Sequence, residues 1–497
     1  MNYRSISFIL GCLLTIEGLF LLLPLLTSVI YKEEAQIYAF ILSIFICVAV
    51  GIVLILFRPK KLVFNAKEGF VTVSLGWILL SIFGSLPFVF SKDIPHFADA
   101  FFETVSGFTT TGASILSNVE AMSHGCLFWR SFTHWIGGMG VLVFLLAIIP
   151  MVSHGESHGG HMHIMKAESP GPSVGKLVPK VKYTALILYL IYLVLTVVLF
   201  VILVIFKMPV FDAILTSFGT AGTGGFGIKN DSMASYSPAI QWTVTIFMAI
   251  FGINFNAFFF IITRKFKSFF KMSEVRCYLG IIAVAITIIM FNAYDRTITF
   301  FDNLRIVAFQ VSSIITTTGF ATTDFNLWPS ASKAVLIGLM FVGACAGSTG
   351  GGIKVSRFII LFKSIKNQML LFLHPGTVRK VKVDNKIVDH DVMRSVNVFF
   401  MTYIVVFASS LFLISFDNYD FETNFTAVLS CMCNIGPGLS KVGPVENFGL
   451  YSDFSKFVLI FDMIAGRLEL YPVLLLFYHR LWRGSISHKK PEKLKAV

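Results

Sequence analysis

Long apolar runs separated by short basic linkers dominate the chain. Residues 6–30 and 36–57 form the first two runs, and each is long enough for a membrane helix, which needs about 20 apolar residues. The first run is too long for a typical signal-peptide core and lacks a small-residue cleavage site, so we predict a retained span. Basic residues follow the second run at Arg58, Lys60, Lys61 and Lys67.

After this pair, one order of runs occurs four times: a long apolar run, a short one, a glycine-bearing stretch and a second long run. The long runs are 70–90 and 126–150, 183–206 and 239–262, 277–294 and 332–360, and 395–416 and 454–479. The short runs are 97–108, 210–219, 300–315 and 421–432. They are too short to cross a bilayer, so we predict re-entrant half-helices.

The stretch after each short run contains a glycine at a matching place. The copies read TTTGA, GTGGF, TTTGF and CNIGP. An Asp-Ala pair lies thirteen residues before Gly112 and thirteen before Gly225, which selects Gly225 over its neighbours Gly222 and Gly224. The matching glycines, Gly112, Gly225, Gly319 and Gly436, recur 113, 94 and 117 residues apart. Such repetition indicates repeated structural units.

These patterns predict an all-α polytopic membrane protein. It has ten spans, arranged as four helix–re-entrant loop–helix repeats around a central pore plus an N-terminal helix pair. An even number of spans places both termini on one side, and the basic linkers mark that side as cytoplasmic. The predicted parts are a helix pair at 1–67, repeats at 68–150, 183–272, 273–362 and 395–483, cytoplasmic linkers at 151–182 and 363–394, and a basic tail at 484–497.

The repeated stretch is suited to binding a dehydrated cation. Non-helical backbone at membrane depth survives only where it is buried or lines a watery cavity, and four segments achieve this by converging on one axis. Glycine takes positive φ cheaply, and a ring of carbonyls can replace the water shell of a monovalent cation. The predicted filter residues are Thr110, Thr111, Gly112, Thr223, Gly224, Gly225, Thr317, Thr318, Gly319, Asn434, Ile435 and Gly436. No acidic ring occurs in the motifs, which favours a monovalent over a divalent ion.

A second glycine-rich segment interrupts run 332–360, which is too long for one straight helix. An unwound segment there should face a cavity and could act as a gate, with a packing kink as the alternative. The predicted gating-loop residues are Gly343, Ala344, Cys345, Ala346, Gly347, Ser348, Thr349, Gly350, Gly351, Gly352 and Lys354. GSTGGGIK here and GTGGFG at 222–227 only superficially resemble phosphate-binding motifs, because neither has the flanking strand or lysine position required.

Arg467 lies inside the last apolar run. A buried arginine costs a few kcal/mol or more in a bilayer, and such residues usually face interior cavities. We predict that Arg467 faces the pore just inside the filter, where it repels cations or holds the gate. Pairing with Asp462 or Glu469, or snorkelling to the membrane surface, are the alternatives.

The composition supports a membrane protein. Of 497 residues, 56% are hydrophobic and 13% charged, and a soluble domain has roughly twice that charged share. The net charge of +13 resides in the linkers, which fits the positive-inside pattern and not nucleic-acid binding. We predict no enzyme activity and no bound cofactor, because paired carboxylates and metal-ligand clusters are missing at membrane depth. For the histidines at 154–163 we prefer a loop to a metal site.

The motifs together resemble one known family. TTTGAS, GTGGFG, TTTGFAT and NIGPGLS, with FWRSFTHWIGGMG, GACAGSTGGGIKVSR and GRLEL, are similar to the TrkH branch of the bacterial TrkH/TrkG/KtrB potassium uptake family. The helix pair at 6–57 favours TrkH over KtrB, which lacks it. The second and fourth copies depart from the simple TTTG form.

The resemblance implies a potassium-selective, channel-like translocation subunit in the bacterial inner membrane, usually a homodimer. It also implies a cytosolic TrkA-like ring that binds the regulating nucleotide and controls the gate. By this similarity K⁺ binds at the filter glycines, Gly347–Gly352 form the gating loop, and Arg467 is the pore arginine. Alternatives are a K⁺/Na⁺ or K⁺/H⁺ symporter, a KtrB-like Na⁺-dependent subunit, or a carrier with alternating access.

Overall fold

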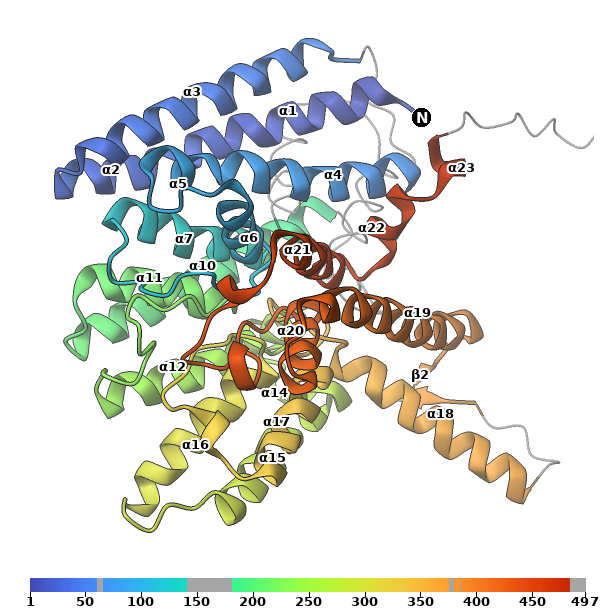
Figure 1. Cartoon of the computed structure of the whole chain (residues 1–497). Helices are drawn as coiled ribbons and strands as arrows, with labels where there is room; N and C mark the ends of the chain where they lie inside the picture. Colours follow the sequence, from blue (N-terminus) through green and yellow to red (C-terminus); the bar gives the residue numbers. More distant parts are fainter. Residues whose placement is uncertain (60–65, 141–180, 375–379, 385, 483–497) are drawn as a thin grey trace, which may run out of the picture.

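The structure is a computed structural model, and it describes residues 1–59, 66–140, 181–374, 380–384 and 386–482. The regular secondary structure of the described part is almost wholly helical (Figure 1), and its single sheet pairs β1 (Lys382–Val383) with β2 (Lys386–Ile387) in antiparallel fashion. The predicted histidine-rich linker up to residue 180, the end of run 126–150 and the basic tail lie outside the described residues.

The N-terminal pair is built from helices α1 (Tyr3–Phe20), α2 (Leu22–Tyr31) and α3 (Glu34–Leu56). Helices α1 and α3 cross so closely that a Cβ on Gly11 would lie 2.7 Å from the carbonyl oxygen of Gly51. Small residues at such crossings let membrane helices approach and gain dispersion contacts. Helix α1 also packs on α4 (Ala66–Gly84), the first helix of the first repeat, and this contact joins the pair to the rest of the molecule.

The described helices follow the order expected for the four predicted repeats, with an outer helix, a short helix and a returning helix in each. These are α4, α6 (Phe97–Phe108) and α7 (His124–Gly138); α10 (Val181–Ile205), α11 (Val210–Gly222) and α12 (Pro238–Phe251); α15 (Ser273–Asn292), α16 (Phe300–Ile315) and α17 (Ser330–Val342); and α19 (His390–Ile414), α20 (Phe421–Cys433) and α21 (Asp453–Arg467). In Figure 1 the repeats follow one another around a common centre, from teal through green and yellow to orange. The short helices begin at the residues that the sequence predicts.

The remaining elements lie within these repeats, between them or after the last one. They are α5 (Leu86–Ser91), α13 (Phe255–Ile262), α14 (Phe266–Lys271), α18 (Val355–Leu373), α22 (Tyr471–Leu476), α23 (His479–Trp482) and the 3₁₀ turns η1 (Phe325–Leu327), η2 (Ser415–Asp417), η3 (Ser440–Val442) and η4 (Phe448–Leu450).

Six helices of the described residues are long and apolar enough to cross a membrane, or seven if the bent pair α12–α13 counts as one span. The ten-span count therefore stays a prediction. The number is lower because three returning runs are broken and the end of the fourth, run 126–150, lies outside the described residues. The break at 343–354 was expected, but run 239–262 bends by 96° and run 454–479 is interrupted at Leu468–Leu470. Asn254 caps α13 through its side chain, and Glu469 and Leu470 have positive φ, so neither run continues as one helix.

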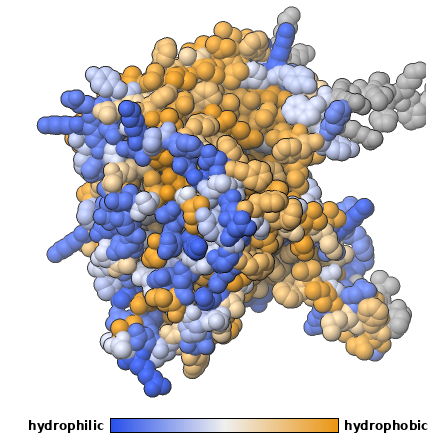
Figure 2. All heavy atoms as spheres, viewed as in Figure 1, coloured by the Kyte–Doolittle hydropathy of each residue, from blue (hydrophilic) through white to orange (hydrophobic). Residues whose placement is uncertain are grey.

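The outer helices expose large apolar side chains. Leu190 of α10, Phe291 of α15 and Val405 of α19 are 59%, 86% and 64% exposed. Figure 2 shows continuous hydrophobic surface at the top of the view, over α1 and α3. A hydrophilic area lies at the left and centre of the same view. Contiguous apolar surface of this kind is stable against lipid and costly against water. The chain is an integral membrane protein by this criterion.

Candidate ion pathway and gate

The four short helices all end with the same backbone turn. In each turn, the first residue beyond the helical backbone adopts a left-handed conformation. Its φ is 55° at Thr110, 55° at Thr223, 56° at Thr317 and 54° at Asn434. Two residues later comes a glycine, with φ of 80° at Gly112, 75° at Gly225, 86° at Gly319 and 106° at Gly436. The residue between them donates its N–H to the carbonyl five positions back, as in Thr111 to Ser106 at 2.9 Å. Four different sequences thus adopt one conformation, and in the second copy Gly225 is the matching glycine.

The four turns close into a ring. A Cβ on Gly112 would lie 1.9 Å from the carbonyl oxygen of Gly224, and one on Gly225 would lie 1.8 Å from that of Thr318. The contacts continue from Gly319 to Ile435 at 2.1 Å and from Gly436 to Thr111 at 2.9 Å. Each glycine therefore lies against the carbonyl of the residue that precedes the next glycine, and the fourth returns to the first. This geometry brings together all twelve predicted filter residues.

Each turn continues into a loop that leads to the returning helix, and we number these loops one to four along the chain. Each loop is hydrogen-bonded to the next, and the fourth to the first, in the same order as the turns of the ring. Loop one binds loop two through the Val119 N–H and Asn230 Oδ1 at 2.8 Å, and loop two binds loop three through the Met233 N–H and the Ala321 carbonyl at 2.9 Å. The other two junctions join the Ser440 N–H to Asn326 Oδ1 at 2.9 Å and the Phe448 N–H to the Ser114 carbonyl at 2.8 Å. These bonds restrain the separation of the four turns.

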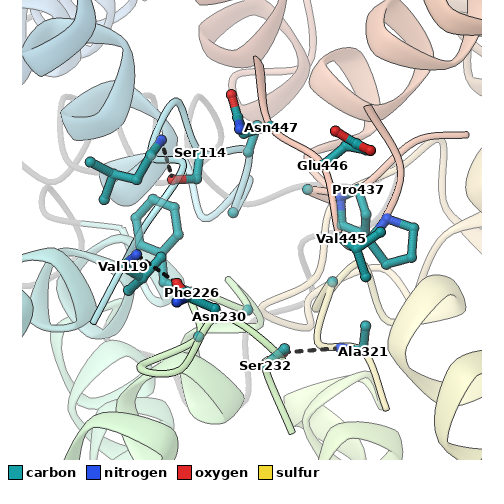
Figure 3. Close-up of a pocket in the computed structure, with 18 of the residues that line it drawn as sticks. Ser114, Val119, Phe226, Asn230, Ser232, Ala321, Pro437, Val445, Glu446 and Asn447 are labelled. Carbon is teal, nitrogen blue, oxygen red and sulfur yellow. Dashed lines mark hydrogen bonds between the residues drawn. The ribbon is translucent and has the colours of Figure 1, made fainter. Parts of the chain in front are cut away.

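A cavity opens on this outer side, and all four glycines contribute to its lining (Figure 3). In Figure 3, Glu446 and Asn447 lie across the cavity from Asn230 and Ser232. Among the described residues that line it, Glu446 supplies the acidic side chain, and Arg130 and Lys229 supply the basic ones. The cavity therefore has no ring of carboxylates, and a cation at the ring would be held by backbone carbonyls and the negative ends of four short helices.

The predicted gating loop, residues 343–354, lies against the side of the ring opposite the cavity, which we call the inner side. It joins α17 to α18, and a Cβ on Gly350 would lie 2.8 Å from the carbonyl oxygen of Thr316. A Cβ on Gly351 would lie 2.3 Å from that of Cys433, and the Gly351 N–H donates to Thr317 Oγ1 at 2.6 Å. The loop therefore touches the third and fourth turns directly, in the approach that only glycine permits.

Bonds from the second and third repeats hold this loop in place. Glu274, at the start of α15, accepts from the Ala346 N–H at 2.7 Å. The break between α12 and α13 contributes the Gly252 carbonyl, which accepts from the Cys345 N–H at 3.0 Å. Lys354 is 1% exposed and donates its ammonium to the Gly350 carbonyl within the loop. Sequence reasoning missed Glu274 and the α12–α13 break, although an acid that opens an apolar run was a usable signal.

Arg467 connects the 343–354 loop to the first repeat. Its guanidinium donates to Thr110 Oγ1 at 3.1 Å, to the Thr349 carbonyl at 2.9 Å and to the carbonyls of Gly137 and Gly138. Arg467 thus contacts both the first turn and the 343–354 loop, and its role as a pore arginine stays a prediction. The two acids named as possible partners have other contacts, since Asp462 accepts from Ser410 and Glu469 pairs with Arg357.

A cavity, a ring of four equivalent turns and a glycine-rich loop against the other side of the ring, set among lipid-facing helices, are typical of a membrane protein for ion transport. The family model of TrkH, a cation transport protein, matches residues 36–489. The chain therefore belongs to the TrkH family, as its motifs suggested.

Similar proteins cover nearly the whole chain. The Trk system potassium uptake protein TrkH of Salmonella typhimurium is 36% identical over 494 residues, covering 97% of this chain and 100% of the relative. The Trk system potassium uptake protein TrkG of Escherichia coli is 32% identical over 495 residues, with 97% and 99% covered. The crystal structure of the potassium transporter TrkH from Vibrio parahaemolyticus superposes with a TM-score of 0.86 at 32% identity, covering 97% of this chain and 100% of that chain.

Proposed function

We propose that this protein is the channel-like potassium translocation subunit of a Trk uptake system. The observation that carries the proposal is the closed ring of four left-handed turns, in which each glycine abuts the carbonyl of the next turn. The relatives named as potassium uptake proteins match over 99% or more of their length, which supports K⁺ as the transported ion.

Selection in this proposal rests on the carbonyl oxygens next to the four glycines. They replace the hydration shell of a monovalent cation, and the partial negative charge of the helix C-termini lowers the cost of dehydration. The packing of Gly225 on Thr318 and of Gly319 on Ile435 leaves no room for a side chain, so the backbone of each turn fixes that of the next. A fixed ring favours the ion whose size it fits.

The gate in this proposal is the loop 343–354 together with Arg467. The loop occupies the inner side of the ring, and Arg467 adds a positive charge there that opposes a cation. Opening requires the loop to leave Thr317 and Arg467 to leave the Thr349 carbonyl. The loop's backbone is suited to such a change, since Gly343, Gly347 and Gly352 have positive φ.

The same proposal includes the setting of the protein. We place it in the bacterial inner membrane with both termini in the cytoplasm, as a homodimer that binds a cytosolic ring carrying the regulating nucleotide. Exposed apolar side chains on α18, such as Phe362 and Phe372, offer a surface for a second copy. Lysines on α18 and the β1–β2 hairpin line one groove and suit an acidic partner surface: Lys363, Lys366, Lys380 and Lys382.

Cation flux into liposomes tests the proposal. The purified protein and a variant with a shortened 344–352 segment are compared with K⁺, Rb⁺, Na⁺ and Li⁺, so that a closed gate in the wild type does not hide conduction. We expect voltage-driven flux that favours K⁺ and Rb⁺ in the variant. Flux that strictly requires a proton or sodium gradient would replace the channel-like mechanism with a coupled symporter.

A further inference from the structure

A buried ion pair lies beside the first filter turn. Glu103 of α6 and Arg130 of α7 meet at 2.6 Å between Oε1 and Nε, and their side chains are 0% and 2% exposed. A buried ion pair of this kind is weak evidence for stability, because desolvation of the two charges cancels most of their attraction. Its contacts therefore decide what it does.

Both members of the pair extend to filter loops. The Glu103 carboxylate accepts from Ser114 Oγ at 2.9 Å and from the Ile115 N–H at 3.0 Å, just beyond Gly112. Arg130 donates to the Gly227 carbonyl at 2.9 Å, and its guanidinium carbon lies 3.5 Å from the ring centre of Phe226, next to Gly225. One ion pair thus connects the outer ends of the first two filter turns.

The fourth loop joins the same cluster. The Ser114 carbonyl accepts from the Phe448 N–H at 2.8 Å, while the Ser114 hydroxyl donates to Glu103. The junction between the fourth and first loops therefore passes through Ser114, which Glu103 contacts. Between the first and second loops, the pair adds a connection to the bond from the Val119 N–H to Asn230. The ion pair therefore links the first turn to the fourth loop through Ser114 and to the second loop through Arg130.

We call the Glu103–Arg130 ion pair the brace. The other repeats have no acidic residue at the position equivalent to Glu103, so they have no equivalent ion pair. The positions nine residues before the matching glycines hold Thr216, Gln310 and Ala427. In the third repeat, Gln310 binds its own loop through a neutral hydrogen bond, in which its Nε2 donates to Thr322 Oγ1 at 3.2 Å. The charged brace is thus specific to the junction between the first and second turns.

We propose that Glu103 and Arg130 are positioning residues that set the potassium selectivity of the filter. The inference rests on the proposed function of the ring. The pair fixes the first turn against the second, where Gly112 lies against the Gly224 carbonyl. Without it, the carbonyls at this junction can move inward and coordinate the smaller Na⁺, while the ring itself and the gate stay intact.

The test measures the K⁺/Na⁺ permeability ratio in liposomes, with every variant made in the loop-shortened background. Glu103→Gln keeps the shape and removes the charge, and we expect the ratio to fall about tenfold. Arg130→Lys keeps the charge but loses the planar guanidinium, which donates to Glu103 and Gly227 at the same time. Ser114→Ala removes the hydrogen bond between the first loop and the Glu103 carboxylate. Both should lower the ratio by about two- to fivefold.

The matched control is Lys333→Gln, which breaks the partly exposed Lys333–Glu422 pair and should leave the ratio unchanged. If Glu103→Gln does not fold, Arg130→Lys and Ser114→Ala still decide the question. An unchanged ratio in every folded brace variant, alongside a lowered ratio in Gly319→Ser, overturns the brace and keeps the filter. An unchanged ratio in Gly319→Ser as well removes the filter assignment itself.

Discussion

The ring and the proposed gating loop are in contact but differ in construction. The ring uses four copies of one backbone turn, and its contacts are mostly between backbone atoms of successive turns. The loop occurs once, and side chains from other repeats hold it, including Glu274 and Arg467. Equivalent contacts around an axis suit a site that must hold its shape, and a single element with a few bonds suits one that must move. Perturbing the ring should change which ion passes, whereas perturbing the loop should change how often any ion passes.

The largest effect is expected from Gly319→Ser. A Cβ at this position would lie 2.1 Å from the Ile435 carbonyl oxygen, and φ of 86° disfavours any side chain, so the turn must shift. We expect the K⁺ over Na⁺ preference to be lost almost completely in flux assays. Gly338→Ser in α17 is the matched control, because a Cβ there meets nothing within 4 Å. Equal K⁺/Na⁺ ratios in the two variants would contradict the role of Gly319.

Shortening 344–352 should have the next largest effect. The segment supplies the Thr349 carbonyl to Arg467 and the Gly351 N–H to Thr317, so its removal frees the inner side of the ring. We expect single-channel records to show an open probability raised about tenfold or more, with the K⁺/Na⁺ ratio kept, on the ground that several bonds of about 1 kcal/mol each are lost. Unaltered gating would refute the gate, and a changed ratio would show that loop and ring are not separable.

Glu274→Gln tests the same separation of ion flux from ion preference by replacing one carboxylate oxygen with an amide nitrogen. It removes the charge from a hydrogen bond to the Ala346 N–H, and charged hydrogen bonds are worth about 1.5–3 kcal/mol where neutral ones are worth about 1. We expect a several-fold rise in K⁺ flux with no change in ion preference. Glu422→Gln, at a partly exposed pair on the third and fourth repeats, is the control. A lower flux would mean that Glu274 supports the open state.

The comparison also explains what the sequence could predict. The ring is repeated, so matching offsets to Gly112 and Gly225 located it without any knowledge of packing. The gating loop was visible because five glycines interrupt an apolar run. The place of Glu274 at the start of an apolar run was a signal, but its contact with Ala346 was not visible, nor was the contact of Glu103 with Arg130. These contacts join residues 72 and 27 positions apart, and neither has a copy in the other repeats. The bend at Gly252–Asn254 was missed for a related reason, since it depends on a cap and on the neighbouring loop.

The smallest expected effect comes from one hydroxyl in the ring. Ser430 donates to the Gly436 carbonyl at 2.6 Å and Ser313 to the Phe320 carbonyl at 2.6 Å, whereas the equivalent Ser106 hydroxyl has no hydrogen-bond partner among the described residues. A lost hydrogen bond of about 1 kcal/mol corresponds to a change of about fivefold at most, so Ser430→Ala should lower the K⁺/Na⁺ ratio by about two- to fivefold. Ser106→Ala should leave the ratio unchanged. If both serines behave alike, the ring is held by its glycine–carbonyl contacts alone and these hydroxyls add nothing to its selectivity.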